Sequence, residues 1–166
     1  PAPPCLAELD RRQSIPLLMS DINLPGDTMS KNASRDLIER YFTAFNDHSI
    51  DGMLACLDED VVHDPNQGKR RIGIAKFKEL CIHMARSYRE ELTDMVIMVS
   101  DDGNRAAAEF TVHGEYLATD EGLPPANGQT YNLPAGTFFE IDDGRISRVT
   151  TYYNLEDWIS QVENAK

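Results

Sequence analysis

The chain has 166 residues, 41% of them hydrophobic and 27% charged, which is enough for one globular domain with a substantial core. It carries 28 acidic residues against 16 lysines and arginines, a formal net charge of −12 at pH 7. That charge repels phosphate backbones and anionic membrane surfaces, so nucleic acid and membranes are not expected as partners. Small molecules and other proteins remain as partner classes.

The three cysteines, Cys5, Cys56 and Cys81, are odd in number and lack the spacing of a metal site. Cys56 and Cys81 fall in helical stretches, where free thiols behave as small hydrophobic groups. The chain also shows neither a long apolar run nor a basic leader. We therefore expect a reducing, cytoplasmic location.

Residues 1–33 differ from the rest because no helical or strand period persists through them. They are expected to form an irregular arm that packs on the domain or on a partner subunit. The domain itself is expected to span residues 34–166, with Ser34 as the cap of its first helix. Apolar residues recur at helical spacing from Leu37 to Phe45.

Two more helices and a short strand are expected in the first half of the domain. Ser49 can cap a short helix over residues 50–57, and the segment VVHDP at 61–65 has the form of a strand end. Gly73 precedes the clearest amphipathic helix, whose apolar stripe runs from Phe77 to Tyr88.

After residue 91 the hydrophobic period changes to two. Strands are expected at 95–99, fully buried, at 106–117, at 131–141 with a bulge or bend at Pro134 and Gly136, and at 145–153. Asn154 caps a last helix. Helices followed by antiparallel hairpins predict an α+β domain, in which helices close one face of a curved sheet into a cone with an apolar interior.

Three stretches carry a family resemblance: RYFTAFNDHSIDGMLACLDEDVVHDP (40–65), GIAKFKEL (73–80) and FFEIDDGRISRVTTYYN (138–154). Together they make residues 34–163 similar to the nuclear transport factor 2-like superfamily. Within it the chain resembles the ketosteroid isomerase and SnoaL-like polyketide cyclase branch, and in particular a steroid delta-isomerase-related bacterial subgroup. The resemblance implies the cone fold and a homodimer.

The same resemblance implies two catalytic positions. Asp64, in the triplet HDP, matches the general-base aspartate of ketosteroid isomerases, and Tyr41 matches their oxyanion-hole tyrosine. Their second oxyanion donor, an acid, falls here on Gly136 or Thr137, neither of which is acidic. Half of the oxyanion hole is therefore expected to be absent.

Moving a proton next to a carbonyl needs a base that reaches the C–H bond and a donor that meets the enolate oxygen. Burial against apolar walls would raise the pKa of Asp64 and make it a stronger base. The alternatives remain that Asp64 is a turn residue before a proline and that Tyr41 is a core aromatic. Strand alternation places His63 on the opposite side from Asp64, where solvent is the favoured environment.

The cavity of the expected cone would be lined by apolar and aromatic side chains from the third helix, the strands and the last helix. These candidate ligand-binding residues are Phe110, Val112, Tyr116, Met84, Tyr88, Phe139, Tyr153 and Trp158. His113 and Glu115 share the outer face of their strand, where we expect a hydrogen-bonded pair at a dimer interface.

The function expected from these residues is binding of a small apolar carbonyl compound, with proton transfer of the isomerase or cyclase type by Asp64 and Tyr41. This chemistry requires no metal and no other cofactor. The alternative is a non-catalytic small-molecule-binding or assembly module of the same fold. Epoxide hydrolysis ranks last, because no arrangement of an arginine with two pocket acids is evident.

Overall fold

The structure is a computed structural model that describes residues 30–165. The expected arm at 1–33 lies outside this range except for residues 30–33, which already belong to the first helix and its cap. The helices are α1 (Lys31–Asn46), α2 (Ile50–Leu54), α3 (Ile74–Ser87) and α4 (Leu155–Asn164). The strands are β1 (Leu57–His63), β2 (Arg71–Ile72), β3 (Tyr88–Val99), β4 (Arg105–Tyr116), β5 (Gln129–Asp142) and β6 (Arg145–Tyr153).

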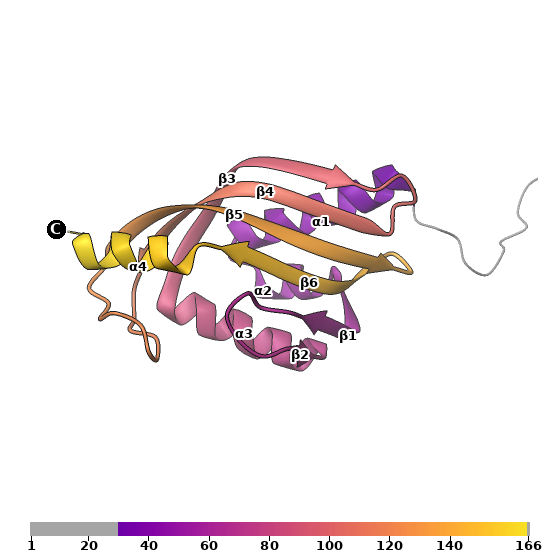
Figure 1. The fold of residues 1–166 in the computed structure, drawn as a ribbon. Helices are drawn as coiled ribbons and strands as arrows, with labels where there is room; N and C mark the ends of the chain where they lie inside the picture. The colour runs from indigo at the N-terminus through magenta and orange to yellow at the C-terminus, as the bar shows by residue number, and fades with distance from the viewer. Residues whose placement is uncertain (1–29, 166) are drawn as a thin grey trace, which may run out of the picture.

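The described strands form one six-stranded sheet in the order β2-β1-β6-β5-β4-β3. The long strands β3 to β6 curve, and helices α1, α2 and α3 lie on the concave side (Figure 1). This is the expected α+β cone. One pairing departs from the antiparallel expectation, because β1 runs parallel to β6. No helix in the described part of the chain is both long and apolar enough to cross a membrane.

Local sequence signals account for most helix starts. Ser49 and Asn154 accept hydrogen bonds from the first turns of α2 and α4, and Gly73, with φ of +96°, precedes α3. Ser34 was expected to cap α1, but the cap is Ser30, which accepts a hydrogen bond from the amide of Ala33. Ser34 is instead buried inside the helix and donates to the carbonyl of Gly103 at 2.7 Å.

Each expected strand is present, but β3 begins at Tyr88 instead of residue 95, because α3 ends at Ser87. The run at 95–99 was expected to be fully buried, but it alternates, with Val96 55% and Met98 51% exposed. No bulge interrupts β5 at Pro134, which pairs with β4 in unbroken register. Pro134 is tolerated because the pairing of β5 with β6 begins at Ala135, so no strand flanks it on that side. The irregularity in the β3–β4 pairing falls at 93–96, where Asp94 has φ of +54°.

Candidate functional site

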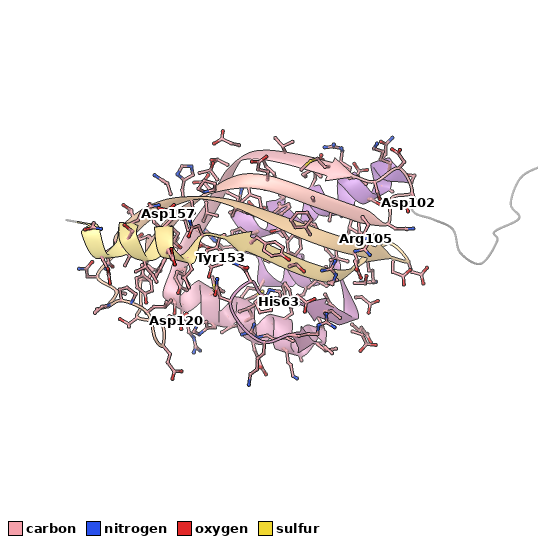
Figure 2. The ribbon with its side chains drawn as sticks, in the orientation of Figure 1. His63, Asp102, Arg105, Asp120, Tyr153 and Asp157 are labelled. Atoms are coloured by element: carbon pink, nitrogen blue, oxygen red, sulfur yellow. The ribbon has the colours of Figure 1, made fainter. Side chains whose placement is uncertain are left out.

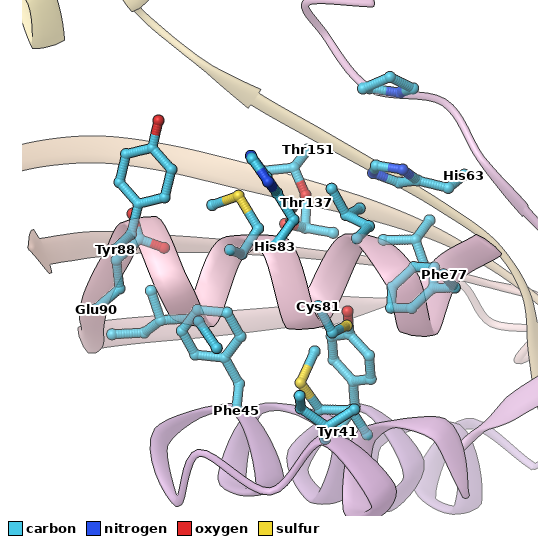
Figure 3. Close-up of a pocket in the computed structure, with 18 of the residues that line it drawn as sticks. Tyr41, Phe45, His63, Phe77, Cys81, His83, Tyr88, Glu90, Thr137 and Thr151 are labelled. Carbon is cyan, nitrogen blue, oxygen red and sulfur yellow. Dashed lines mark hydrogen bonds between the residues drawn. The ribbon is translucent and has the colours of Figure 1, made fainter. Parts of the chain in front are cut away.

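The interior of the cone contains a cavity of about 470 Å³. Its walls come from α1, α2, α3, the end of β1 and the concave faces of β3 to β6. In Figure 3, Tyr41, Phe77 and His63 gather at one end, Tyr88 and Glu90 lie toward the other, and the Thr137 and Thr151 hydroxyls lie between. A cavity of this size with a few polar groups on apolar walls is the usual form of a small-molecule site.

Tyr41 reaches the cavity from the apolar stripe of α1, as expected. Its ring makes edge contacts with Phe42 and Phe139, and the residue is 5% exposed. Burial is the main cause that raises the pKa of Tyr41 well above its ordinary value, so the phenol is neutral. Among residues 30–165 no group hydrogen-bonds to its hydroxyl. Tyr41 therefore presents a free O–H donor at the cavity wall.

Thr137 and Thr151, on neighbouring strands β5 and β6, also face the cavity. Their hydroxyl oxygens lie 3.0 Å apart and share one hydrogen bond. Of the two positions considered for the second oxyanion donor, Thr137 is the one that lines the cavity, whereas Gly136 does not. The position is polar although it is not acidic.

His63 lies in the cavity wall, not in solvent as favoured from the sequence. It is 8% exposed, its ring makes an edge contact with Phe77, and Figure 2 shows it between β6 and α3. Burial first, and the charge of Arg71 second, lower the pKa of His63 to about 4, so the ring is neutral at physiological pH. The alternation of His63 and Asp64 was correct, but the side assigned to each was reversed.

Asp64 does not line the cavity. Its carboxylate accepts two hydrogen bonds from Arg70, at 2.7 and 2.9 Å, and its side chain remains 24% exposed. The hydrogen bond from Arg70 is the largest cause that holds the pKa of Asp64 below its ordinary value. The expected rise in the pKa of Asp64 is therefore wrong, because the side chain meets a guanidinium and not an apolar wall.

The cavity does hold a carboxyl group with a raised pKa, on Glu90 of β3. Burial raises the pKa of Glu90, and a hydrogen bond that the Tyr131 hydroxyl donates to Oε1 at 2.6 Å partly opposes this. Tyr131 reaches Glu90 by crossing Gly114, where an added Cβ would lie 2.0 Å from the Tyr131 ring. Gly114, in an otherwise alternating strand, was the sequence signal for this close approach.

A second carboxyl group, that of Asp120, also lines the cavity. Asp120, in the loop between β4 and β5, receives a hydrogen bond from the Tyr88 hydroxyl at 3.1 Å and lies 2.9 Å from Nε2 of His83. Burial alone would raise the pKa of Asp120, but its hydrogen bonds, first that to His83, lower it overall. Asp120 is therefore a charged acceptor with several partners, whereas the carboxyl of Glu90 has the single donor Tyr131.

The eight candidate ligand-binding residues divide into two groups. The cavity is lined by Phe110, Met84, Tyr88 and Tyr153. The other four do not line it and lie in the packed core: Val112, Tyr116, Phe139 and Trp158. The tryptophan is surrounded by aromatic rings, including that of Tyr116 at 5.0 Å, which explains its burial.

His113 and Glu115 do lie on the outer side of β4, but they do not bond to each other. Glu115 pairs with Arg89 at 2.7 Å, and His113 contacts Thr93 and Asn132 at 2.9 and 2.6 Å. Residues on adjacent strands thus provide their partners, because successive same-side residues on one strand are farther apart than cross-strand neighbours.

Comparison with known proteins places this chain in a family. The sequence matches the SnoaL-like domain over residues 38–149, more than half of the chain. A "putative polyketide cyclase" of Silicibacter sp. TM1040 is 60% identical over 81% of this chain and 98% of that chain, with a TM-score of 0.78. A protein of the same description from Pseudomonas putida KT2440 is 57% identical over 81% of this chain and 98% of that chain, with a TM-score of 0.77. Another, from Xanthomonas campestris pv. campestris, is 54% identical over 80% of this chain and 98% of that chain, also with a TM-score of 0.77. No curated protein matches the sequence. The chain belongs to the SnoaL-like domain family of the nuclear transport factor 2-like superfamily.

Proposed function

We propose that the protein binds a small, largely apolar carbonyl compound in the cavity and moves a proton at the carbon next to the carbonyl, in an isomerase-like or cyclase-like reaction. The observation that carries the proposal is the neutral Tyr41 hydroxyl, free of partners among the described residues, on an apolar cavity wall. The carbonyl oxygen becomes negative as the proton leaves, and a fixed donor in a water-poor site stabilises that charge. The similarity to proteins described as putative polyketide cyclases supports the same chemistry.

The threonine pair supports this chemistry with a further neutral donor. Thr137 and Thr151 together carry two hydroxyl protons, and the bond between them uses one. The other proton is free to point at a ligand, whichever of the two oxygens donates. Neutral donors on apolar walls suit the oxygen of an uncharged ligand such as a ketone.

For the base we propose Glu90 in place of Asp64. In the proposed step the C–H bond breaks and its electron pair forms a C=C bond, while the π pair of the carbonyl moves to its oxygen to give the enolate and the proton joins the Glu90 carboxylate. Return of that proton to a different atom isomerises the compound, and attack of the enolate carbon on a second carbonyl closes a ring. A raised pKa makes Glu90 a stronger base than an exposed carboxylate. The ion pair with Arg70 has the opposite effect on Asp64, because it lowers the pKa of that carboxyl.

The proposal is tested by the exchange of carbon-bound hydrogen in a simple ketone. The protein is mixed with 2-tetralone in D₂O, and loss of the protons next to the carbonyl is followed by NMR. We expect the wild-type protein to accelerate exchange, and Glu90→Gln and Tyr41→Phe each to lower that acceleration by about 10²-fold or more. Glu91→Gln is the matched control, because Glu91 is exposed and lies outside the cavity.

The same assay judges the second candidate function, a non-catalytic binding module. The observation that favours it is that Asp64, at the position of the family base, is turned to Arg70. If 2-tetralone binds to the wild-type protein but exchanges at the rate of the buffer, the binding module is correct and the proton transfer is not.

We also propose that the protein is a cytoplasmic homodimer. The outer face of the sheet over β3, β5 and β6 exposes Val96, Met98, Phe138 and Tyr152, each more than half exposed. Helices α1, α2 and α3 cover only the other face (Figure 1). An apolar strip on an uncovered sheet, flanked by the mixed charges of Arg105, Glu140 and Arg148, suits a second copy of itself. The free thiols of Cys56 and Cys81 suit a reducing compartment.

A further inference from the structure

Nδ1 of His63 is the one fully buried side-chain nitrogen or oxygen atom of the described residues that has no hydrogen-bond partner. His63 ends β1 and lines the cavity at the end where Tyr41 and Phe77 lie (Figure 3). We propose that His63 is the second oxygen-binding donor of the cavity and holds the ligand's carbonyl oxygen through its Nε2–H. This inference rests on the proposed function and names a further residue in it.

The two ring nitrogens have different surroundings. Nδ1 is fully buried and has no partner. Nε2 makes no hydrogen bond among residues 30–165 and is not among the fully buried unpartnered atoms, so it retains accessible surface. The residue lines the cavity, and since Nδ1 is fully buried, Nε2 is the ring nitrogen that a ligand there can reach. His63 is thus a side chain that is more than nine-tenths buried, with its one reachable nitrogen at the site.

Proton accounting assigns the role of each nitrogen. A neutral imidazole carries one N–H and one lone pair. Burying an unpaired N–H is rarer in proteins than leaving an acceptor unpaired, so the favoured tautomer keeps the lone pair on Nδ1 and the proton on Nε2. The lowered pKa of His63 keeps the ring in this neutral form at physiological pH. The cavity therefore receives an N–H donor without a charge.

The surroundings of the ring favour this state from each packed element. Arg71 on β2 opposes protonation, and Asp64, the residue that follows β1, favours it less strongly. Phe77 on α3 holds the ring by an edge contact, with centroids 5.5 Å apart at 75°. Val149 on β6 pairs with His63 in the sheet and fixes its inward direction. The imidazole is thus both oriented and uncharged before a ligand binds.

The consequence is an oxyanion site in which a neutral histidine takes the place of the protonated acid as the second donor. Tyr41 offers an O–H from α1 and His63 an N–H from β1, and a neutral imidazole can polarise a carbonyl without being protonated first. The acidic donor that the sequence lacks at Thr137 is then unnecessary. A ligand with an oxygen acceptor would satisfy His63, whereas the corresponding hydrocarbon would leave its donor unpaired.

The tautomer is tested without any ligand. Protein labelled with ¹⁵N on histidine side chains is examined by NMR, and the His63 signals are identified by their loss in His63→Gln. We expect a neutral ring with the proton on Nε2 from pH 7 down to about pH 5. A proton on Nδ1, or a cationic ring at pH 6, overturns the proposal.

The contact itself is tested with 2-tetralone labelled with ¹³C at the carbonyl, whose infrared stretch falls in frequency with each hydrogen bond. The matched variants are His63→Gln, whose amide nitrogen takes the place of Nε2, and His63→Asn, whose shorter side chain takes the place of Nδ1. We expect His63→Asn to lose a substantial part of the wild-type shift and His63→Gln to keep most of it. Equal shifts in wild type and His63→Asn overturn the proposal.

The outcomes separate this inference from the proposed function. If His63→Asn changes the carbonyl band while wild-type protein fails to accelerate exchange of 2-tetralone, His63 is a ligand donor and the proton transfer is wrong. If the band responds to Tyr41→Phe and not to His63→Asn while the wild-type protein accelerates exchange, the proton transfer stands and the His63 contact is wrong. A band that the wild-type protein does not shift overturns both.

Discussion

At the scale of single residues, Glu90 and Asp64 show how surroundings decide the character of a carboxyl group. Asp64 meets a guanidinium at 2.7 Å and stays partly exposed, so its charged form is favoured. Glu90 faces the cavity with one phenolic donor, so burial favours its neutral form. A base needs affinity for a proton, and only Glu90 has gained it.

The exchange assay distinguishes these two acids directly. We expect Asp64→Asn to retain the wild-type acceleration of 2-tetralone exchange within about threefold, since the side chain does not line the cavity. Loss of exchange in a folded Asp64→Asn protein, with Glu90→Gln unaffected, would restore Asp64 as the base.

The sequence predicted the alternation of His63 and Asp64 but not which of them points inward. That choice depends on the pairing of β1 with β6, where His63 lies beside the buried Val149 and shares its face. A parallel pairing between distant strands leaves no local signal. Glu90 was missed because the helical stripe was extended to Tyr88 and the strand was expected to begin only after residue 91, so its direction was undefined.

At the scale of elements, the pairing of β4 with β5 at Gly114 and Tyr131 positions the proposed base, Glu90. Gly114 leaves room for the Tyr131 ring to cross β4 and donate to Glu90. We expect Gly114→Ala to lower the free energy of unfolding by about 1–3 kcal/mol or more, because the new Cβ would overlap the ring. Urea unfolding measures the loss.

Gly136→Ala is the matched control for that substitution. Gly136 also lies within the sheet, in β5, but its added Cβ would lie 3.4 Å from the nearest neighbouring atom, the Ala108 carbonyl oxygen. We expect this variant to remain within about 1 kcal/mol of the wild type or to gain slightly from the lost chain entropy. Equal destabilisation of the two variants would contradict the role given to Gly114.

Elements with local signals were predicted well, and elements set by distant contacts were not. Residues close in sequence determine helix caps such as Ser49 and Asn154. They also determine the alternating burial of β4. The exposure of Val96 and Met98 was missed because a run of apolar residues does not indicate which face of the sheet other elements cover. The expected bulge at Pro134 was wrong because an edge position tolerates proline without one.

At the scale of the whole molecule, one face of the curved sheet encloses the cavity and the other carries the exposed apolar strip of β3, β5 and β6. We expect the wild-type protein to have about twice the mass of one chain by light scattering, and Phe138→Glu to dissociate it. Ile72→Glu is the matched control, because Ile72 is 54% exposed on the far strand β2. A wild-type monomer would contradict the proposed dimer.

The central claim is that Glu90 is a buried carboxyl group facing the cavity and poised to accept a proton. Its most direct test is the titration of the Glu90 side-chain carbon by ¹³C NMR, with Glu90→Gln identifying the signal. Because the folded pKa is raised, the group holds its proton to higher pH than in the unfolded chain, so folding stability falls as pH rises through the folded pKa. We predict a midpoint above the ordinary glutamate value of about 4.3, and a midpoint at or below that value would contradict the account.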